Sequence, residues 1–365
     1  MSNAFFVEVL IDQSLARPLD YAVPESLQSQ VKIGARVEVP LKNTLKQGTI
    51  SAIKKTSKFP NVRSISRLLL PHATLSPALW QLAEWMSQYY ACPMQKVVKC
   101  FTPPNIRKET QVKLHQTVSL LMSLEEACLQ IGKNPAQLQV VQALAAAGAP
   151  MALAPLIASL NISKSPLSTL AKKKIVSIDA APAADLSEEE FFSTKPKVLK
   201  EEQAACLASI LASLEKREFA AHLVHGVTGS GKTEVYMQAI QAALDQQRSA
   251  LLLVPEIALT SQTIERLKAR FQKKIAILHH RRSLGERSAA WDLLLRNEAQ
   301  IVVGARSAIF APAQNVGLII IDEEHDSSYK QSDEAPCYHG RDVAVMRAHI
   351  EKAVVLLGSA TPSLE

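Results

Sequence analysis

A glycine-rich segment, HGVTGSGKTEVY, carries the residues of this chain that are best spaced for chemistry. Gly226 to Thr233 fit the pattern G-x-x-x-x-G-K-[ST], in which a loop wraps around nucleotide phosphates. Gly229 and Gly231 let backbone amides point at the phosphates. Lys232 would meet the β and γ oxygens, and Thr233 would hold Mg²⁺ at the start of a helix. The segment therefore predicts a site for ATP and Mg²⁺. The residues expected to contact the nucleotide are Gly226, Thr228, Gly229, Ser230, Gly231, Lys232 and Thr233.

A second segment, GLIIIDEEHD, supplies acids of the kind that such a site needs. Asp322 follows an apolar run that is typical of a buried strand, so its carboxylate is placed to bind Mg²⁺. Glu323 is the next residue and can polarise the water that attacks the nucleotide. Lys232, Asp322 and Glu323 form the predicted catalytic set for nucleotide hydrolysis.

One polar residue before the glycine-rich segment has two interpretations. Gln203, in KVLKEEQAAC, could recognise the adenine ring. An exposed glutamine on an ordinary helix explains the same residue nearly as well.

The elements that must position these groups begin at about residue 197. Apolar runs of Leu, Ile and Val without polar alternation are separated by amphipathic helices, a pattern typical of parallel strands covered on both faces. We therefore expect a multidomain α/β protein with a RecA-like parallel-sheet lobe over residues 198–365. In such a sheet ligands bind beyond the carboxyl ends of the strands, and the motifs follow the runs HLVHG, ALLLVP, IVVG, GLIIIDEE and AVVLLGSAT.

The first third of the chain holds the whole excess of positive charge. Residues 1–110 carry 14 Lys and Arg against 7 Asp and Glu, whereas residues 111–365 carry 27 of each sign. Short runs such as FFVEVLI, ARVEVPL and GTISAI are separated by Pro and Gly, which predicts a small β-barrel-like domain over residues 1–110. Nine bases against the single acid Glu38 over residues 32–67 favour DNA binding, and a solvated basic face is the alternative.

The segment PALWQLAEWMSQYY, residues 77–90, is expected to form an amphipathic helix. We interpret its aromatic residues as core in preference to a platform for base stacking. The positions at helical spacing are Leu79, Leu82, Ala83, Met86 and Tyr90.

Residues 111–180 are expected to form a winged-helix domain. A helical pattern over residues 135–147 ends at Gly148, and two further helical runs close in a β-like segment. The lysines from Lys172 to Lys174 suit both a DNA groove and the carboxyl end of a helix, so both roles stay open.

The remaining composition points to an ordinary globular protein, with 47% hydrophobic and 21% charged residues. Residues 181–197 are acidic and rich in Ala and Pro, which predicts a domain linker.

No signal peptide or apolar stretch of about 18 residues is present, so we expect a cytoplasmic protein without a membrane partner. The five cysteines are widely spaced and lack a C-x-x-C pair, so we expect reduced thiols without a ligand role.

In chain order, GVTGSGKT, VPEIALT, VGARSAIFAP, DEEHD and GSATPS resemble the motifs of superfamily 2 helicases. The wider wording, including DEEHDSSYKQ, YHGRDVAV and the N-terminal RPLDYAVPE, is similar to the PriA family of primosomal replication-restart helicases. The resemblance covers nearly the whole chain and is most specific over residues 222–363. It implies an ATP-dependent 3'-to-5' DNA helicase that recognises stalled or abandoned forks and initiates replication restart by primosome assembly. Its implied partners are branched and single-stranded DNA, including D-loops, single-stranded-DNA-binding protein and other primosome proteins.

The same resemblance implies roles for individual residues. The N-terminal domain would hold the 3' end of the nascent leading strand, and the winged helix would contact fork duplex. The segment YKQSDEAPCYHGRD resembles the family's aromatic-rich loop, with ring faces for base stacking. Cys337 stands where the family more often has a basic residue, which weakens the expected DNA contact of that loop. The implied DNA contacts are Asp20, Lys42, Arg63, Thr260, Arg306, Ser307, Tyr329, Tyr338, His339 and Arg341, and the implied coupling residues are Ser359 and Thr361.

The last residue lies four positions after Thr361, so the resemblance implies the amino-terminal half of such a helicase. The second motor lobe, a Zn²⁺-binding cysteine-rich module and a C-terminal domain would lie outside it. That lobe would supply an arginine finger, which typically contributes about 10³ to 10⁵ in rate. We therefore expect weak or absent activity from this chain alone. A non-catalytic fragment that binds branched DNA is the alternative, and a small-molecule kinase or metabolic ATPase leaves the order of motifs unexplained.

Overall fold

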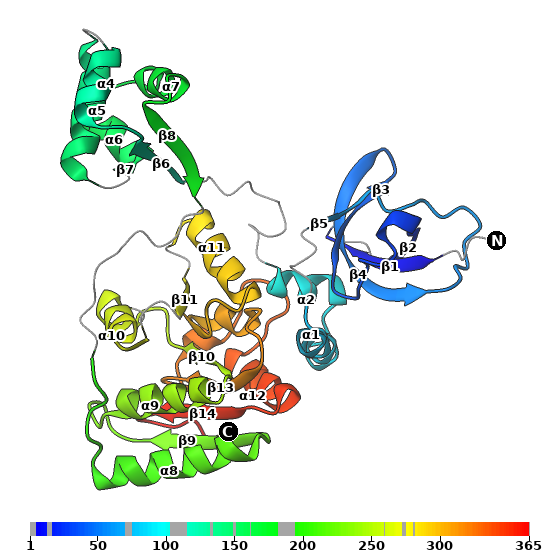
Figure 1. The fold of residues 1–365 in the computed structure, drawn as a ribbon. Helices are drawn as coiled ribbons and strands as arrows, with labels where there is room; N and C mark the ends of the chain where they lie inside the picture. Colours follow the sequence, from blue (N-terminus) through cyan, green and yellow to red (C-terminus); the bar gives the residue numbers. More distant parts are fainter. Residues whose placement is uncertain are drawn as a thin grey trace. The chain divides into compact units, whose positions relative to one another are not determined.

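The computed structural model forms two compact units, one from Met1–Glu109 with Glu189–Glu365 and the other from Thr110–Glu188 (Figure 1). Most of the predicted linker, residues 182–193, lies outside the described residues. Within the described part, no helix is long and apolar enough to cross a membrane. The structure describes residues 5–12, 17–69, 75–102, 115–131, 134–148, 151–160, 162–181, 194–258, 260–271, 275–279 and 282–364.

The chain begins with a five-stranded antiparallel sheet in the order β2-β1-β4-β3-β5. Alternate residues of the first strand, Val7 and Val9, are fully buried, which is the pattern of a sheet with one covered face. Gly48 crosses Val9 so closely that a Cβ would lie 2.5 Å from its Cγ1. The predicted β-rich domain is confirmed, and its barrel-like closure stays a prediction. The elements are β1 (Phe6–Ile11), β2 (Leu19–Ala22), a 3-10 turn η1 (Glu25–Leu27), β3 (Arg36–Leu41), β4 (Thr44–Lys54) and β5 (Arg67–Leu69).

Two helices, α1 (Pro77–Tyr89) and α2 (Met94–Phe101), follow this sheet and pack into the core of the parallel-sheet lobe. The Ser76 hydroxyl caps α1 by accepting a hydrogen bond from the backbone N–H of Leu79. Four of the five predicted apolar positions of α1 are buried, and Tyr90 is half-buried. Tyr89 is 61% exposed, so the aromatic residues of this segment are only partly core.

The second unit contains a three-stranded antiparallel sheet in the order β7-β6-β8 with its own apolar core. Helix α5 ends at Gly148, which has a φ of 60° and donates its N–H to the carbonyl of Leu144, as the sequence predicts. The assignment of this unit as a winged helix stays a prediction. The elements are β6 (His115–Leu120), α4 (Leu124–Ile131), α5 (Pro135–Ala147), β7 (Met151–Ala152), α6 (Leu153–Leu160), α7 (Ser165–Lys172) and β8 (Val176–Ala181).

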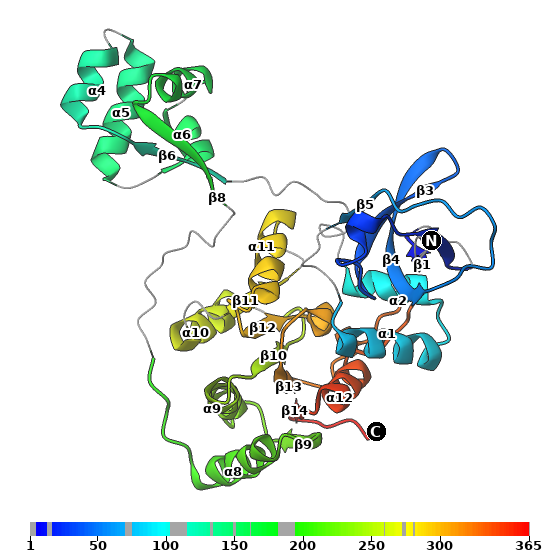
Figure 2. The same ribbon diagram turned by 45° about the vertical axis from the view of Figure 1, so that its right-hand side comes forward.

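The rest of the first unit is a six-stranded, wholly parallel sheet in the order β11-β12-β10-β13-β14-β9, as predicted. Successive residues of β13 point to opposite faces, and both faces are covered. Helices α8, α9 and α10 cover one face, and α11, α12 and α1 cover the other (Figure 2). The elements are α8 (Glu201–Lys216), β9 (Ala220–His225), α9 (Lys232–Asp245), β10 (Ser249–Leu253), α10 (Ser261–Phe271), β11 (Ile275–Leu278), α11 (Leu284–Leu295), β12 (Ile301–Gly304), η3 (Arg306–Phe310), β13 (Val316–Ile321), η4 (Ser327–Tyr329), α12 (Gly340–Glu351) and β14 (Val354–Ser359).

A buried ion pair in the N-terminal sheet offers a test of its packing. The Arg36 side chain is 1% exposed, and its two terminal nitrogens each lie 2.7 Å from a carboxylate oxygen of Asp12. We predict that Asp12→Ala lowers the free energy of unfolding of this unit by about 3 kcal/mol, because it leaves a buried cation without its counter-ion. Urea denaturation measures this loss. The matched control is Glu38→Ala, which removes one ion pair of the half-exposed Arg67 and should cost about 1 kcal/mol or less. Equal losses in the two variants would contradict the prediction.

Candidate nucleotide-binding site

Three neighbouring strands end level with one another at one edge of the parallel sheet. Ile321 of β13 pairs with Leu357 of β14, and Ser359 of β14 pairs with His225 of β9. The glycine-rich loop follows β9 directly, and Asp322 follows β13 directly. The register therefore brings the loop and the acidic segment to one rim, which is where parallel sheets bind ligands.

Backbone hydrogen bonds join the segments at this rim. The N–H of Gly226 donates to the carbonyl of Ser359 at 3.1 Å, and the N–H of Glu324 donates to the carbonyl of Gly358 at 2.9 Å. The N–H of Asp322 donates to Leu253 of β10 at 2.9 Å. The three predicted motifs are thus held together by their main chains.

The glycine-rich loop has the backbone that phosphate binding needs. Gly229 and Gly231 have φ values of 82° and 88°, a region that favours glycine, and α9 begins at Lys232 with its free amides at the rim. The Lys232 amine lies 2.6 Å from the carbonyl of Gly226. The Ser230 hydroxyl is buried without a hydrogen-bond partner, and Thr233 is exposed. An unpartnered hydroxyl next to the start of a helix fits an anionic ligand.

Gln203 supports this loop from α8. Its amide nitrogen donates to the carbonyl of Ser230 at 2.6 Å, and its amide oxygen accepts from the backbone N–H of Lys200 at 2.9 Å. A Cβ on Gly231 would lie 2.4 Å from the same amide nitrogen, so the loop packs closely on it. Gln203 is therefore not a free surface glutamine, and its recognition of adenine stays a prediction.

Asp322 is held from two sides by buried tyrosines. The Tyr236 hydroxyl donates to the Asp322 Oδ1 at 3.2 Å, and the Tyr329 hydroxyl donates to the Asp322 carbonyl at 2.7 Å. Burial and the charge of Glu323 raise the pKa of Asp322, although the Tyr236 hydrogen bond and the charge of Lys232 oppose this. Glu323 has a φ of 48°, an uncommon value for a residue with a side chain. The lysine and the two acids thus lie at one rim, as the predicted catalytic set requires.

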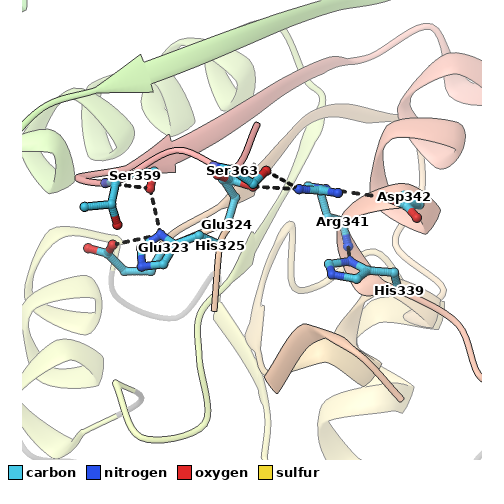
Figure 3. A network of polar contacts seen from close by, with 9 residues as sticks. Glu323, Glu324, His325, His339, Arg341, Asp342, Ser359 and Ser363 are labelled. Atoms are coloured by element: carbon cyan, nitrogen blue, oxygen red, sulfur yellow. Dashed lines mark hydrogen bonds and ion pairs between the residues drawn. The ribbon is translucent and has the colours of Figure 1, made fainter. Parts of the chain in front are cut away.

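Of the two predicted coupling residues, Ser359 contacts the acidic segment, and Thr361 contacts Ser359 (Figure 3 shows Ser359). The Ser359 hydroxyl lies 2.7 Å from the His325 Nδ1 and accepts a hydrogen bond from the backbone N–H of Thr361 at 3.1 Å. The same His325 nitrogen lies 3.8 Å from a carboxylate oxygen of Glu323. Ser359 is fully buried at the end of β14, and its contact with His325 joins this strand to the acidic segment.

Arg341 has internal partners in place of the predicted DNA contact (Figure 3). Its guanidinium lies 3.0 Å from the carboxylate of Glu324, which is 2% exposed, and 3.4 Å from Asp342. Glu324 also accepts hydrogen bonds from the backbone and hydroxyl of Ser363. The pKa of Glu324 lies below its usual range because these hydrogen bonds outweigh the effect of burial. Sequence reasoning missed Glu324, since one acid among several carries no sign of burial.

The predicted stacking faces of Tyr329 and Tyr338 are wrong for this structure, because the side chains are 0% and 5% exposed. The Tyr338 ring packs edge-on against Phe310 at 5.1 Å between centroids. The predicted DNA contact Arg306 also lies inside this cluster: it donates to the carbonyl of Ser328 at 3.1 Å and sits 5.7 Å from the centre of the Tyr338 ring. The loop therefore folds its aromatic residues inward.

The other predicted contacts in this lobe lie nearer the surface. Ser307 and Thr260 are exposed, and the Thr260 hydroxyl accepts a hydrogen bond from the backbone N–H of Thr263 at 3.3 Å. His339 is half-buried and caps α12 by accepting a hydrogen bond from the N–H of Arg341 at 3.2 Å. Their contacts with DNA stay predictions.

Three predicted residues of the N-terminal domain share one open pocket of about 290 Å³, namely Asp20, Lys42 and Arg63. The Asp20 carboxylate accepts hydrogen bonds from Ser57 at 2.7 Å and Lys54 at 3.0 Å. Burial raises the pKa of Asp20, but these hydrogen bonds and nearby lysines bring it below the usual range. Asp20 is therefore a charged acceptor at neutral pH in a mainly apolar pocket that also contains the bases Lys42 and Arg63.

Two family models match this chain, one over the parallel-sheet lobe and one over the N-terminal domain. Residues 200–365 match the DEAD/DEAH box helicase family, and residues 8–103 match the family described as the PriA 3'DNA-binding domain. The parallel sheet with its glycine-rich loop thus lies in the segment that matches the DEAD/DEAH box helicase family.

Curated relatives match nearly the whole chain. The chain is 41% identical over 366 residues to the replication restart protein PriA of Chlamydia pneumoniae, covering 99% of this chain and 49% of that protein. It is 33% identical over 432 residues to the Bacillus subtilis protein of the same name, covering 99% and 54%. A solved structure of RecG bound to a three-way DNA junction is 24% identical, with a TM-score of 0.37, covering 48% of this chain and 22% of that one. The chain is similar over nearly its whole length to replication restart proteins of the PriA family and spans about half the length of the curated relatives it matches.

The raised pKa of Asp322 predicts a pH-dependent stability effect in the absence of Mg²⁺. Above the raised native pKa the buried carboxylate is ionised at a cost, and Asp322→Asn removes this cost, since its side-chain oxygen can still accept from Tyr236. We expect the variant to melt about 2 °C or more higher than the parent at pH 7. The gain should vanish below pH 3.8, where the carboxyl is protonated in both the folded and the unfolded state.

Thermal unfolding in EDTA between pH 3.5 and 7 measures this difference. Asp333→Asn changes an exposed carboxylate in the same lobe and is the control. A lower melting temperature for Asp322→Asn at pH 7 would show that the native state favours the charged carboxylate.

Proposed function

We propose that this chain is part of an ATP-dependent 3'-to-5' DNA helicase that recognises stalled replication forks and initiates replication restart. The observation that carries the proposal is the convergence of Lys232, Asp322 and Glu323 at one rim of the parallel sheet. Single-stranded-DNA-binding protein and other primosome proteins are its proposed partners. Because the chain spans about half of its relatives, we propose that it hydrolyses ATP weakly or not at all by itself.

The residues at the rim fit ATP with Mg²⁺. The buried Ser230 hydroxyl and the amides at the start of α9 would hold phosphate oxygens, and Lys232 would turn from the Gly226 carbonyl toward them. Thr233 and Asp322 would hold Mg²⁺, which neutralises charge on the phosphates when bound. Glu323 would orient and deprotonate water, and Ser359 and Thr361 would connect these acids to the end of β14.

The N-terminal pocket supports binding of a DNA 3' end. Its bases attract phosphate, and the ionised Asp20 can accept a hydrogen bond from a terminal 3' hydroxyl. All residues that line this pocket lie between Leu19 and Arg63, so it includes none of the nucleotide-site residues. It therefore also supports the second candidate, a fragment that binds branched DNA without catalysis.

We predict that Lys232→Ala weakens ATP binding by about 30-fold or more, because it removes a charge that hydrogen-bonds to phosphate. The rise in melting temperature with ATP and Mg²⁺ measures this affinity. Lys216→Ala changes an exposed lysine of α8 and should leave the rise unchanged. Equal nucleotide-induced stabilisation of the parent and Lys232→Ala would refute the proposed nucleotide site.

For the pocket, we predict that the parent binds duplex DNA with a recessed 3' hydroxyl about 10-fold more tightly than the same DNA with a 3' phosphate. Asp20→Asn should lose most of this discrimination, because the amide repels the phosphate less than the carboxylate does. Fluorescence anisotropy without ATP measures the affinities, with Glu38→Gln as the control on the same sheet. Discrimination that persists in Asp20→Asn would exclude Asp20 as the group that reads the 3' end. Unchanged discrimination in Lys232→Ala is expected, since this binding needs no nucleotide.

A further inference from the structure

Tyr236 lies beneath the nucleotide-binding rim and has no role in the function proposed above. It follows Lys232 by four residues on α9, so both side chains lie on the same face of the helix. Side chains of helices point back toward the preceding turn, which here is the glycine-rich loop. Tyr236 is 1% exposed, so its hydroxyl must find a partner inside the protein.

That partner is the side chain of Asp322. The Tyr236 hydroxyl donates to Oδ1 at 3.2 Å, and the backbone N–H of Glu323 also hydrogen-bonds to this carboxylate. The main chain of Asp322 is fixed separately, because its N–H donates to Leu253 and its carbonyl accepts from the Tyr329 hydroxyl. The backbone position and the carboxylate orientation thus have different supports.

Gly358 of β14 provides the space for this contact. A Cβ at that position would lie 1.7 Å from the Tyr236 hydroxyl oxygen, 2.8 Å from its ring carbon Cζ and 3.3 Å from the Asp322 Oδ1. The two distances to the tyrosine are well below van der Waals contact, so a side chain at 358 and the tyrosine hydroxyl exclude each other. The ring therefore passes directly over the backbone of β14 to reach β13.

We propose that Tyr236 is a positioning residue for Asp322: its hydroxyl holds one carboxylate oxygen so that the other is oriented toward Mg²⁺ of a bound nucleotide, and Gly358 leaves the room that this requires. The inference rests on the proposed nucleotide site. Mg²⁺ demands near-ideal octahedral geometry, so the orientation of its carboxylate ligand matters. Hydrogen bonds to metal ligands typically change metal affinity by about 10- to 100-fold when they are lost.

The test is Tyr236→Phe in the full 365-residue chain, which removes the hydroxyl and keeps the ring. Isothermal titration calorimetry measures the affinity for a non-hydrolysable ATP analogue in EDTA, and then the Mg²⁺ concentration that gives half of the metal-dependent gain in affinity. We expect the affinity in EDTA to stay within about 2-fold and the half-maximal Mg²⁺ concentration to rise about 10-fold or more. Tyr90→Phe is the matched control, because it removes a hydroxyl that accepts from the backbone of His339 and does not touch Asp322.

The possible results distinguish a failure of the positioning role from a failure of the proposed nucleotide site. An unchanged Mg²⁺ requirement in Tyr236→Phe, with normal Mg²⁺-dependent binding in the parent, overturns the positioning role alone. No nucleotide binding by the parent overturns the proposed nucleotide site and this inference together. A weaker affinity in EDTA with an unchanged Mg²⁺ requirement overturns the inference and shows that Tyr236 supports the loop.

A second pair of variants tests whether Gly358 provides the space for the Tyr236 hydroxyl. Gly358→Ala should lower the melting temperature and raise the Mg²⁺ requirement, because its methyl group displaces the tyrosine hydroxyl. Adding Tyr236→Phe should recover part of the lost melting temperature, since the closest atom is then absent, but it should not recover the Mg²⁺ requirement. Gly358→Ala with the melting temperature and Mg²⁺ requirement of the parent would contradict the inferred contact.

Discussion

The parallel pairing of β9, β14 and β13 is the constraint on which the rest of the site depends. Its register sets Val224 beside Gly358 and Leu357 beside Ile321, so the glycine-rich loop, the end of β14 and the acidic segment leave the sheet at one level. Apolar side chains on both faces of β13 and β14, and Val224 on one face of β9, favour that register, because a slip of one residue would turn each buried side chain to the opposite face. Chemistry at the rim is thus a consequence of packing within the sheet.

Polar contacts beneath the rim fix the orientations of the side chains in the acidic segment. Two buried tyrosines hold Asp322, the Glu324 ion pair with Arg341 joins the acidic segment to α12, and Ser359 contacts His325. Each partner comes from a different element, so movement of one element alters the others. Arg306, beside the buried ring of Tyr338, donates a hydrogen bond to the carbonyl of Ser328 in the loop that follows the acidic segment. A continuous set of polar and aromatic contacts therefore runs from the nucleotide side of the lobe to this loop.

Features set by local pattern were predictable from the sequence, and features set by tertiary contacts were not. The parallel sheet, the helix end at Gly148, the apolar face of α1 and the loop before Lys232 each follow from residue spacing. By contrast, the inward rings of Tyr329 and Tyr338 and the internal partners of Arg341 depend on residues distant in the chain, as does the contact of Tyr236 with Asp322. An aromatic or basic residue in a loop suggests DNA contact by its chemistry alone, but its burial is decided by neighbours that no local pattern specifies. The Tyr236 contact had one sequence signal, its spacing of four from Lys232.

The most direct test of the shared rim is the position of a metal ion with a nucleotide. Crystals of this chain grown with a non-hydrolysable ATP analogue and Mn²⁺ would locate the metal through its anomalous scattering. The phosphates should lie at the start of α9, and the metal between Thr233 and the carboxylate of Asp322. A metal distant from Asp322, or phosphates bound away from the glycine-rich loop, would contradict the site described here.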